Sequence, residues 1–286
     1  MSSPAPAPAG RILLVGCGKM GRALGTGWLA RGLPPNNLLA VEPDNSNATA
    51  ANAEGIAVVA RPEDLYPDFT PDWTVLAVKP QVLAAAAAYA QFSATSHYLS
   101  IVAGKTLTEL TALLGQDARV VRAMPNTPVA VGRGITATVA GEGVLPAARE
   151  KCTALLAAVG DVVWLDEETM MDAVTAVSGS GPAYVFLLIE CLSEAGRQAG
   201  LPTGLAGRLA LATVAGAGEL ARLSEEDAAT LRQNVTSPAG TTEAALEVLM
   251  DMKVGFQPLL TSAIAAAARR SKELASIATP AQRELD

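Results

Sequence analysis

The residues with the clearest chemical potential form one run near the C-terminal end, Asn234-Val-Thr-Ser-Pro-Ala-Gly-Thr-Thr-Glu243. The run is rich in hydroxyl groups, and its Pro and Gly predict a turn that leads directly into a helix. The first N–H groups of a helix have no partner within it and carry partial positive charge, so they bind a carboxylate without Lys or Arg. The run therefore predicts a site for a small anionic substrate.

A second pattern lies far earlier in the chain and predicts a cofactor. It has the spacing G-x-G-x-x-G, it follows an apolar strand pattern at Arg11–Val15, and a helical pattern comes after it. In that context Gly16 permits a tight turn, Gly18 lets a pyrophosphate approach the backbone, and Gly21 lets the helix pack on the sheet. A purely structural glycine turn is the alternative. The loop consists of Gly16, Cys17, Gly18, Lys19, Met20 and Gly21.

Charged side chains near this loop are candidates for contact with the cofactor. Glu42 ends the second strand pattern, where an acid commonly bonds the ribose hydroxyls of NAD and disfavours NADP. A solvated turn carboxylate is the alternative for Glu42, and Arg61 with the segment 44–47 offers donors for a 2′-phosphate. Lys79 follows another strand at the edge that faces the ligand, with a plain surface lysine as its alternative. Its segment consists of Ala77, Val78, Lys79 and Pro80.

The amino-acid composition limits which kinds of catalytic or metal site the chain can form. Of the 286 residues 50% are hydrophobic but only 4% are aromatic, so packing relies on Ala, Leu, Val and Gly. The three cysteines are widely separated and fit no C-x-x-C spacing, which favours small buried thiols over disulfides or thiolate metal sites. The single histidine, His97, excludes multi-His zinc sites, and its place at the start of an apolar run indicates a strand edge. We expect no metal.

Charge and hydropathy indicate the partners and the compartment. Residues 1–165 contain 12 basic and 12 acidic side chains, whereas residues 166–286 contain 9 and 16, which supplies the whole net charge of −7. This balance argues against nucleic acid. No apolar run reaches the roughly 18 to 20 residues that cross a bilayer, and residues 1–10 lack the basic and apolar regions of an export signal. We expect a cytoplasmic protein with no membrane partner.

The elements that position these residues fall into two domains behind a flexible Pro/Ala-rich tail at residues 1–10. Over residues 11–165 short apolar runs alternate with helical patterns, which predicts an α/β domain with a doubly wound, mostly parallel, Rossmann-like sheet. A capping-box spacing at Thr106-Leu-Thr-Glu109 predicts one helix start. The expected strands are Arg11–Val15, Leu38–Val41, Trp73–Val78, Tyr98–Val102, Arg119–Ala123, Ile135–Val139 and Val162–Leu165.

Residues 166–286 predict an all-α domain. The apolar runs become long and helical, and small residues recur along them, which indicates close helix contacts between subunits. We expect helices that start at Ser180 with Pro182 in the first turn, at 201–203, at Ser224–Asp227, at Thr242 and after Pro258. The first of these should end at Gly200, the second near Leu223 and the fourth at Met252.

These segments together resemble the pyrroline-5-carboxylate reductases, the family that completes proline biosynthesis. The match extends over nearly the whole chain, and the motifs occur in order. One block alone would be a strand-ending turn or a helix cap, whereas six in register are specific. The blocks are Gly16-Cys-Gly-Lys-Met-Gly21, Ala77-Val-Lys-Pro80, Ser100-Ile-Val-Ala-Gly104, Arg122-Ala-Met-Pro-Asn-Thr-Pro128, Val177-Ser-Gly-Ser-Gly-Pro-Ala-Tyr184 and Asn234-Val-Thr-Ser-Pro-Ala-Gly-Thr-Thr242.

The resemblance implies an NAD(P)H-dependent reduction of 1-pyrroline-5-carboxylate, a cyclic imine, to L-proline. It implies a helical domain that pairs into a homodimer, with a decamer as the larger assembly. The glycine loop, Lys79, Ala103 and Gly104 would hold the dinucleotide, and Asn126 would lie near the nicotinamide. The substrate carboxylate would bind the 234–242 loop of a neighbouring subunit, and Thr242 would face the ring nitrogen. The implied substrate site consists of Asn234, Ser237, Gly240, Thr241 and Thr242.

Two departures from the family pattern bear on the coenzyme. Glu42 stands where NADP-preferring members often have a small hydroxyl residue, and Arg61 stands near a usual Asn. Because many members favour NADPH, we expect NADP(H) to be preferred and NAD(H) to be accepted. The alternatives are a β-hydroxyacid dehydrogenase or imine reductase, which generally needs a Lys or Asp in the helical domain, and a dinucleotide-sensing regulator without turnover. Glu225 is a further candidate partner for the ring nitrogen, although its segment reads equally well as a helix start.

Overall fold

The fold was analysed in a computed structural model that describes residues 8, 10–92 and 94–277. The chain divides into two compact units, one comprising the chain up to Gly179 and from Ala268 onward, the other Ser180–Ala267. The compact units divide after Gly179, and the predicted boundary between residues 165 and 166 stays a prediction. The predicted tail at residues 1–10 lies outside the described residues apart from positions 8 and 10.

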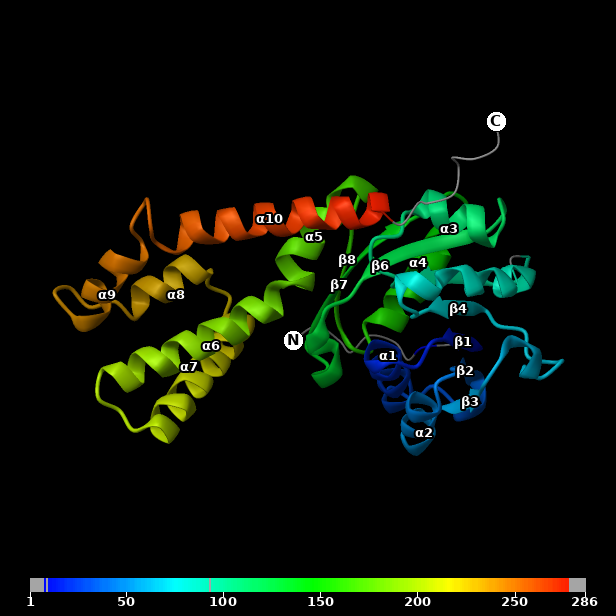
Figure 1. The fold of residues 1–286 in the computed structure, drawn as a ribbon, viewed down its shortest axis with the longest axis horizontal. Coiled ribbons are helices and arrows are strands. Elements are labelled where there is room, and N and C mark those ends of the chain that lie inside the picture. The colour runs from blue at the N-terminus through cyan, green and yellow to red at the C-terminus, as the bar shows by residue number, and fades with distance from the viewer. Residues whose placement is uncertain (1–7, 9, 93, 278–286) are drawn as a thin grey trace. The chain divides into compact units, whose positions relative to one another are not determined.

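The first unit contains one eight-stranded sheet, in the order β3-β2-β1-β4-β5-β6-β7-β8 (Figure 1). All neighbouring strands are parallel except β6 and β7, so the predicted α/β, mostly parallel, doubly wound sheet is confirmed. The order reverses between β1 and β4, which creates the crevice where open α/β sheets bind ligands. The strands are β1 Ile12–Val15, β2 Leu38–Val41, β3 Ala57–Val59, β4 Trp73–Leu76, β5 His97–Ser100, β6 Arg119–Met124, β7 Gly134–Ala140 and β8 Gly160–Trp164.

The sequence patterns found seven of these strands and missed β3. This strand has only three residues and pairs with β2 alone, so it carries no periodicity that a sequence reveals. The predicted strands Trp73–Val78 and Tyr98–Val102 were each two residues too long at the C-terminal end. In both cases the apolar residues that follow the strand pack against the two cores of this unit instead of continuing the sheet.

Helices cover both faces of the sheet. Alternate residues of each strand point to opposite faces, so in β1 Ile12 and Leu14 join one core while Leu13 and Val15 join the other. The first core also receives Trp28 and other residues of α1 and α4, and the second receives residues of η3 and α3. The helices are α1 Lys19–Ala30, η1 Pro35–Asn37, α2 Asn45–Ala53, η2 Pro62–Asp64, η3 Pro80–Phe92, α3 Leu107–Leu114, η4 Thr127–Val131, α4 Pro146–Leu156, η5 Glu168–Met170, α5 Met171–Val174 and η6 Thr175–Gly179.

The predicted capping box at α3 is confirmed. The Thr106 hydroxyl accepts a hydrogen bond from the Glu109 N–H at 3.2 Å, and the Glu109 carboxylate accepts one from the Thr106 N–H at 2.9 Å. These two bonds satisfy donors that a helix start otherwise leaves without a partner. The box therefore fixes where the loop after β5 ends.

The second unit is entirely helical, as predicted. Pro182 lies in the first turn of α6, and Asp227 caps α8 by accepting the Thr230 N–H at 2.8 Å. The predicted helix 242–252 starts one residue earlier and ends three earlier. The last helix starts two residues before Pro258, since a proline is tolerated in a first turn. The helices are α6 Gly181–Gln198, α7 Thr203–Leu223, α8 Ala228–Asn234, α9 Thr241–Leu249 and α10 Phe256–Ile277, which continues into the first unit.

This second unit has no apolar core of its own. Within residues 180–267 the buried apolar side chains are only Ala206 and Ala210, and many large ones are exposed, among them Phe186, Leu187 and Leu209. Exposed apolar surface on this scale marks an interface rather than a solvated face. The unit therefore presents an apolar surface suited to a partner.

The sequence expectation about membrane-spanning length was wrong for one segment. The continuous helical stretch Glu168–Gln198 is long and apolar enough to cross a bilayer by length and composition. The expectation counted only uninterrupted apolar runs, whereas the charged residues of this stretch cluster toward its ends and leave a window that is apolar on average. One such helix is weak evidence for a membrane, and its exposed apolar face is equally suited to another subunit.

Candidate active site

The glycine loop lies at the point where the strand order reverses. Its first residue, Gly16, follows β1 directly and has a φ of +98°, a conformation that residues with a Cβ rarely adopt. The Gly16 N–H donates to the Val41 carbonyl at 2.9 Å, and the Ala77 N–H donates to the Val15 carbonyl at 2.8 Å. A Cβ on Gly16 would lie 2.8 Å from the Ala77 oxygen. The tight turn therefore needs glycine both for its torsion and for its close approach to β4.

The two remaining glycines fit the roles expected from the pattern. Gly18 is the N-cap of α1, and a Cβ built on it would meet no described heavy atom within 4 Å, so its outer side is open. A Cβ on Gly21 would collide with the Gly16 carbonyl oxygen, so this glycine lets α1 start against the turn. Lys19 is exposed on the first turn of α1, and Met20 is half-buried beside it. This open helix start fits a dinucleotide pyrophosphate.

Glu42 is buried rather than solvated. It is 8% exposed, and its two carboxylate oxygens accept hydrogen bonds from the Cys17 N–H at 2.7 Å and the Asp44 N–H at 3.0 Å. The alternative of a solvated turn carboxylate is therefore wrong. The carboxylate joins the glycine loop to the end of β2, and contact with a ribose stays a prediction.

The cysteines divide into two groups. Cys17 and Cys152 are buried, as expected, whereas Cys191 on α6 is exposed, which contradicts the expectation for that residue in this chain. Burial, with a smaller contribution from the nearby Glu42 carboxylate, raises the pKa of the Cys17 thiol to about 12. A thiol with that pKa carries almost no thiolate at neutral pH, so Cys17 packs the loop and supplies no nucleophile.

Lys79 and Arg61, the two basic candidates for coenzyme contact, lie in different surroundings. Lys79 is exposed in the segment after β4, where Ala77, Val78 and Pro80 are half-buried. The Arg61 guanidinium forms an ion pair with Asp64 at 3.2 Å on the exposed surface. Any phosphate on Arg61 therefore competes with Asp64. The segment 44–47 acts as a helix start, with Asp44 accepting the Asn47 N–H at 2.9 Å.

The other predicted cofactor residues follow parallel strands and meet at the same sheet edge. Gly104, with φ of +71°, and the exposed Ala103 lie in the loop after β5. Asn126 follows β6, is 9% exposed, and accepts the Ile135 N–H on Oδ1 at 2.9 Å. Because β1, β4, β5 and β6 all run parallel, the segments after their carboxyl ends lie along one edge.

The 234–242 run forms an exposed turn in the second unit. The Gly240 N–H donates to the Ser237 carbonyl at 3.0 Å, and Ala239 has positive φ of 55°. Thr241 and Thr242 are the first two residues of α9, whose leading N–H groups have no acceptor within the helix. The predicted turn and helix start are therefore confirmed, although the Gly240 N–H is already used inside the turn.

Asn234 is engaged elsewhere, because its side-chain amide donates to the Glu226 carboxylate at 2.9 Å. The pattern also gave no role to Glu243, whose carboxylate accepts the Ala239 N–H at 2.6 Å. Its place three residues after the N-cap Gly240 is the spacing from which a side chain reaches back over a helix start. Glu243 therefore braces the turn from within.

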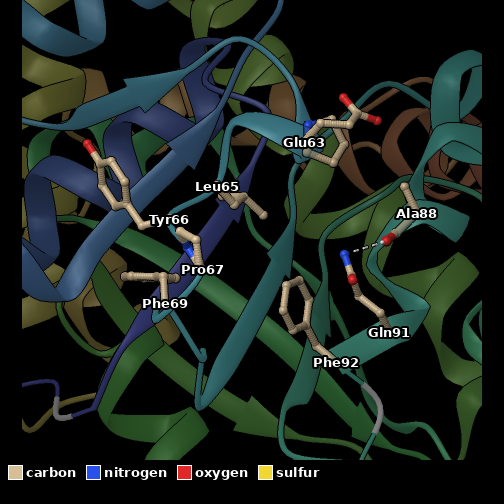
Figure 2. Close-up of a pocket in the computed structure, with 9 residues that line it drawn as sticks. Glu63, Leu65, Tyr66, Pro67, Phe69, Ala88, Gln91 and Phe92 are labelled. Atoms are coloured by element: carbon tan, nitrogen blue, oxygen red, sulfur yellow. Dashed lines mark hydrogen bonds between the residues drawn. The ribbon is translucent and has the colours of Figure 1, made fainter.

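One cavity lies apart from these residues. It has a volume of about 370 Å³ and is lined from the η2 loop and from η3, with the rings of Tyr66, Phe69 and Phe92 in its wall (Figure 2). None of the predicted site residues is among its lining residues. Among the described residues no group of three or more His, Cys, Asp or Glu side chains could hold a metal ion.

Comparison with known proteins identifies the family. A model described as pyrroline-5-carboxylate reductase dimerisation matches residues 168–274, and one described as NADP oxidoreductase coenzyme F420-dependent matches residues 11–104. The pyrroline-5-carboxylate reductase of Pseudomonas aeruginosa is 42% identical over 268 residues, covering 93% of this chain and 97% of the relative. That of Arabidopsis thaliana is 38% identical over 275 residues, covering 95% and 98%.

Solved structures agree with this result. A pyrroline-5-carboxylate reductase from Coxiella burnetii superposes with a TM-score of 0.86 at 34% identity, covering 93% of this chain and 98% of that one. A Plasmodium falciparum pyrroline carboxylate reductase with NADP bound gives a TM-score of 0.79 at 28% identity, covering 94% and 99%. Through these matches, and as its motifs predict, the chain belongs to the pyrroline-5-carboxylate reductase family.

Proposed function

We propose that the protein reduces 1-pyrroline-5-carboxylate to L-proline with NADP(H) as the preferred coenzyme and NAD(H) as an accepted one. The observation that carries this proposal is a near-full-length match to reductases of this name, in a chain whose glycine loop has the open helix start that a pyrophosphate needs. When bound, the reduced nicotinamide supplies the hydride for the C=N bond. The protein's part is to bind and orient.

Residues of the first unit bind the coenzyme, and one turn of the second unit binds the substrate. The glycine loop, the segment Ala77–Pro80 and the pair Ala103–Gly104 hold the dinucleotide, and Asn126 lies beside its nicotinamide end. In the 234–242 turn, the N–H groups at the start of α9 and the Ser237 hydroxyl hold the substrate carboxylate. Thr242 contacts the ring nitrogen, and as an unactivated hydroxyl it orients the ring or relays a proton from water.

Self-association follows from the helical unit. Its exposed apolar surface and its match to a dimerisation model both indicate a second copy of the chain. We propose a homodimer in which the 234–242 turn serves the neighbouring subunit, with a decamer as the larger assembly. The cytoplasmic location and the absence of nucleic-acid and membrane partners stay predictions.

The two alternative functions differ from our proposal in the residues or the turnover that they require. A β-hydroxyacid dehydrogenase or imine reductase with a lysine in the helical domain would depend on Lys253 or Lys272, whereas our proposal depends on Thr242. A dinucleotide-sensing regulator would bind coenzyme without imine-dependent turnover. The reductase and the regulator therefore separate in one activity measurement, and the Thr242 variant tests the residue on which our proposal depends.

The test is oxidation of NADPH and of NADH, followed by absorbance with and without pyrroline-5-carboxylate, for the wild type and Thr242→Ala. We expect imine-dependent oxidation that falls at least tenfold in the variant. The matched control is Thr261→Ala, which removes an exposed hydroxyl from α10 that bonds to Gln257 one turn earlier, donating to its carbonyl at 2.8 Å and accepting from its side-chain amide at 3.1 Å. Coenzyme binding without oxidation would favour the regulator, and full activity of Thr242→Ala would exclude our role for that residue.

A further inference from the structure

One carboxylate joins three elements that lie far apart in the sequence. A single oxygen of Glu168, Oε1, accepts a hydrogen bond from the Arg122 guanidinium at 2.6 Å and from the Leu107 N–H at 2.8 Å. Arg122 lies on β6, Leu107 is the first residue of α3, and Glu168 begins η5. The partners are 46 and 61 residues from Glu168 in the sequence, and all three belong to the first unit.

The contact is partly protected from water. The Arg122 side chain is 11% exposed and the Glu168 side chain 26%. A charge-assisted hydrogen bond in such surroundings is stronger than one on the surface, and removing one partner leaves the other charge buried without compensation. The pair is therefore a fixed point of the structure rather than a screened surface ion pair.

The bond from the Leu107 N–H to Glu168 holds the loop after β5. Leu107 follows Ala103–Thr106 directly, and that loop is short and braced: the Lys105 ammonium, 6% exposed as a residue, bonds Glu109 at 2.8 Å. With Gly104 in a left-handed conformation and the capping box in place, the loop has little freedom of its own. A shift of Leu107 therefore moves Ala103 and Gly104.

The bond from Arg122 to Glu168 holds the end of β6. Arg122 pairs with Ser100 on β5 and with Val139 on β7, so it sits between the two neighbouring strands. Four residues further on comes Asn126, in the turn that opens η4. The strand end that carries Asn126 is therefore set by the same contact as the loop after β5.

We propose that Glu168 is a positioning residue for coenzyme binding. Its carboxylate ties the first residue of the segment matched by the dimerisation model to Leu107 and Arg122, which lie next to the two coenzyme segments, Ala103–Gly104 and Asn126. The inference rests on the proposed function only in assigning these two segments to the coenzyme.

The experiment measures the NADPH dissociation constant of the full-length oligomer by the change in nicotinamide fluorescence, so that it needs no turnover. We compare Glu168→Ala, which removes both bonds, with Glu168→Gln, which keeps an acceptor oxygen of the same shape but not the charge. Glu167→Gln is the matched control, because Glu167 is the exposed neighbour and its carboxylate accepts a hydrogen bond from the hydroxyl of nearby Thr169, at 3.0 Å. Melting temperature and oligomeric mass are recorded for each.

We expect the dissociation constant to rise about tenfold in Glu168→Ala and severalfold in Glu168→Gln, which corresponds to about 1.4 kcal/mol for the tenfold change. Glu167→Gln should match the wild type. A lowered melting temperature with an unchanged dissociation constant in Glu168→Gln would overturn the proposal, since the contact would then be structural only. If the wild type binds NADPH but does not reduce pyrroline-5-carboxylate, the proposed function fails while this comparison still decides the role of Glu168.

Discussion

The Glu42 carboxylate offers the sharpest test of how the glycine loop works. Its oxygens accept the N–H groups of Cys17 and Asp44, and it is 8% exposed. In Glu42→Gln the amide keeps one acceptor oxygen, so one of the two N–H groups faces an NH₂ group instead. We expect this variant to loosen the loop and leave the choice of coenzyme unchanged.

The magnitude follows from the two bonds. A hydrogen bond to a charged group contributes about 1.5–3 kcal/mol and a neutral one about 0.5–1.5, while a buried donor left without an acceptor costs about 1–3 kcal/mol. Together the substitution costs about 2–4 kcal/mol of unfolding free energy. At roughly 2–4 °C per kcal/mol for a domain of about 150–250 residues, the melting temperature falls by about 5–15 °C.

The assay combines thermal unfolding with kcat/KM for NADPH and for NADH. As a brace, Glu42 supports the loop for both coenzymes, so both values fall while their ratio stays within about twofold. The matched control is Glu54→Gln, which removes the same charge from a residue paired with Arg22 at 3.6 Å near the same helix start. An unchanged melting temperature with a tenfold rise in the NADPH to NADH ratio would refute this reasoning, since it would mean that the carboxylate reads the ribose.

Two further predictions use the altered pKa values. Burial of Glu109 opposes ionisation, but hydrogen bonds from Lys105 and Thr106 outweigh it and hold the pKa below its usual 4.5. Because the folded-state pKa is the lower one, the stability that these hydrogen bonds contribute is present above pH 4.5 and is lost as pH falls through the folded-state pKa. In Glu109→Gln the unfolding free energy should therefore depend less steeply on pH in that range, as followed by circular dichroism. An unchanged pH dependence would contradict this prediction. Burial raises the pKa values of the Cys17 and Cys152 thiols, so both should resist iodoacetamide at pH 8 in the folded protein and react once urea unfolds it. Alkylation is measured by mass spectrometry. Alkylation of either thiol without urea would show that the glycine loop or α4 opens in the folded protein.

Local patterns were sufficient to predict much of this protein. The tight turn at Gly16, the start of α3 at Thr106 and the turn before Thr241 each depend on residues close together in the chain. Glycine torsions, helix caps and alternating apolar residues act over a few positions, so their consequences can be read without knowing the fold. The family motifs belong to the same class, because each is a short contiguous block.

Contacts between distant residues were decided only by the tertiary structure. Nothing near Glu42 in the sequence indicates that its carboxylate turns toward Cys17, and nothing near Glu168 indicates Arg122 or Leu107 as partners. These pairings depend on the order in which parallel strands assemble, which brings loops from separate strand-helix units to one edge. The spacing of residues therefore predicts which chemistry is present, while the strand order determines which side chains are held by one another and which remain available to a ligand.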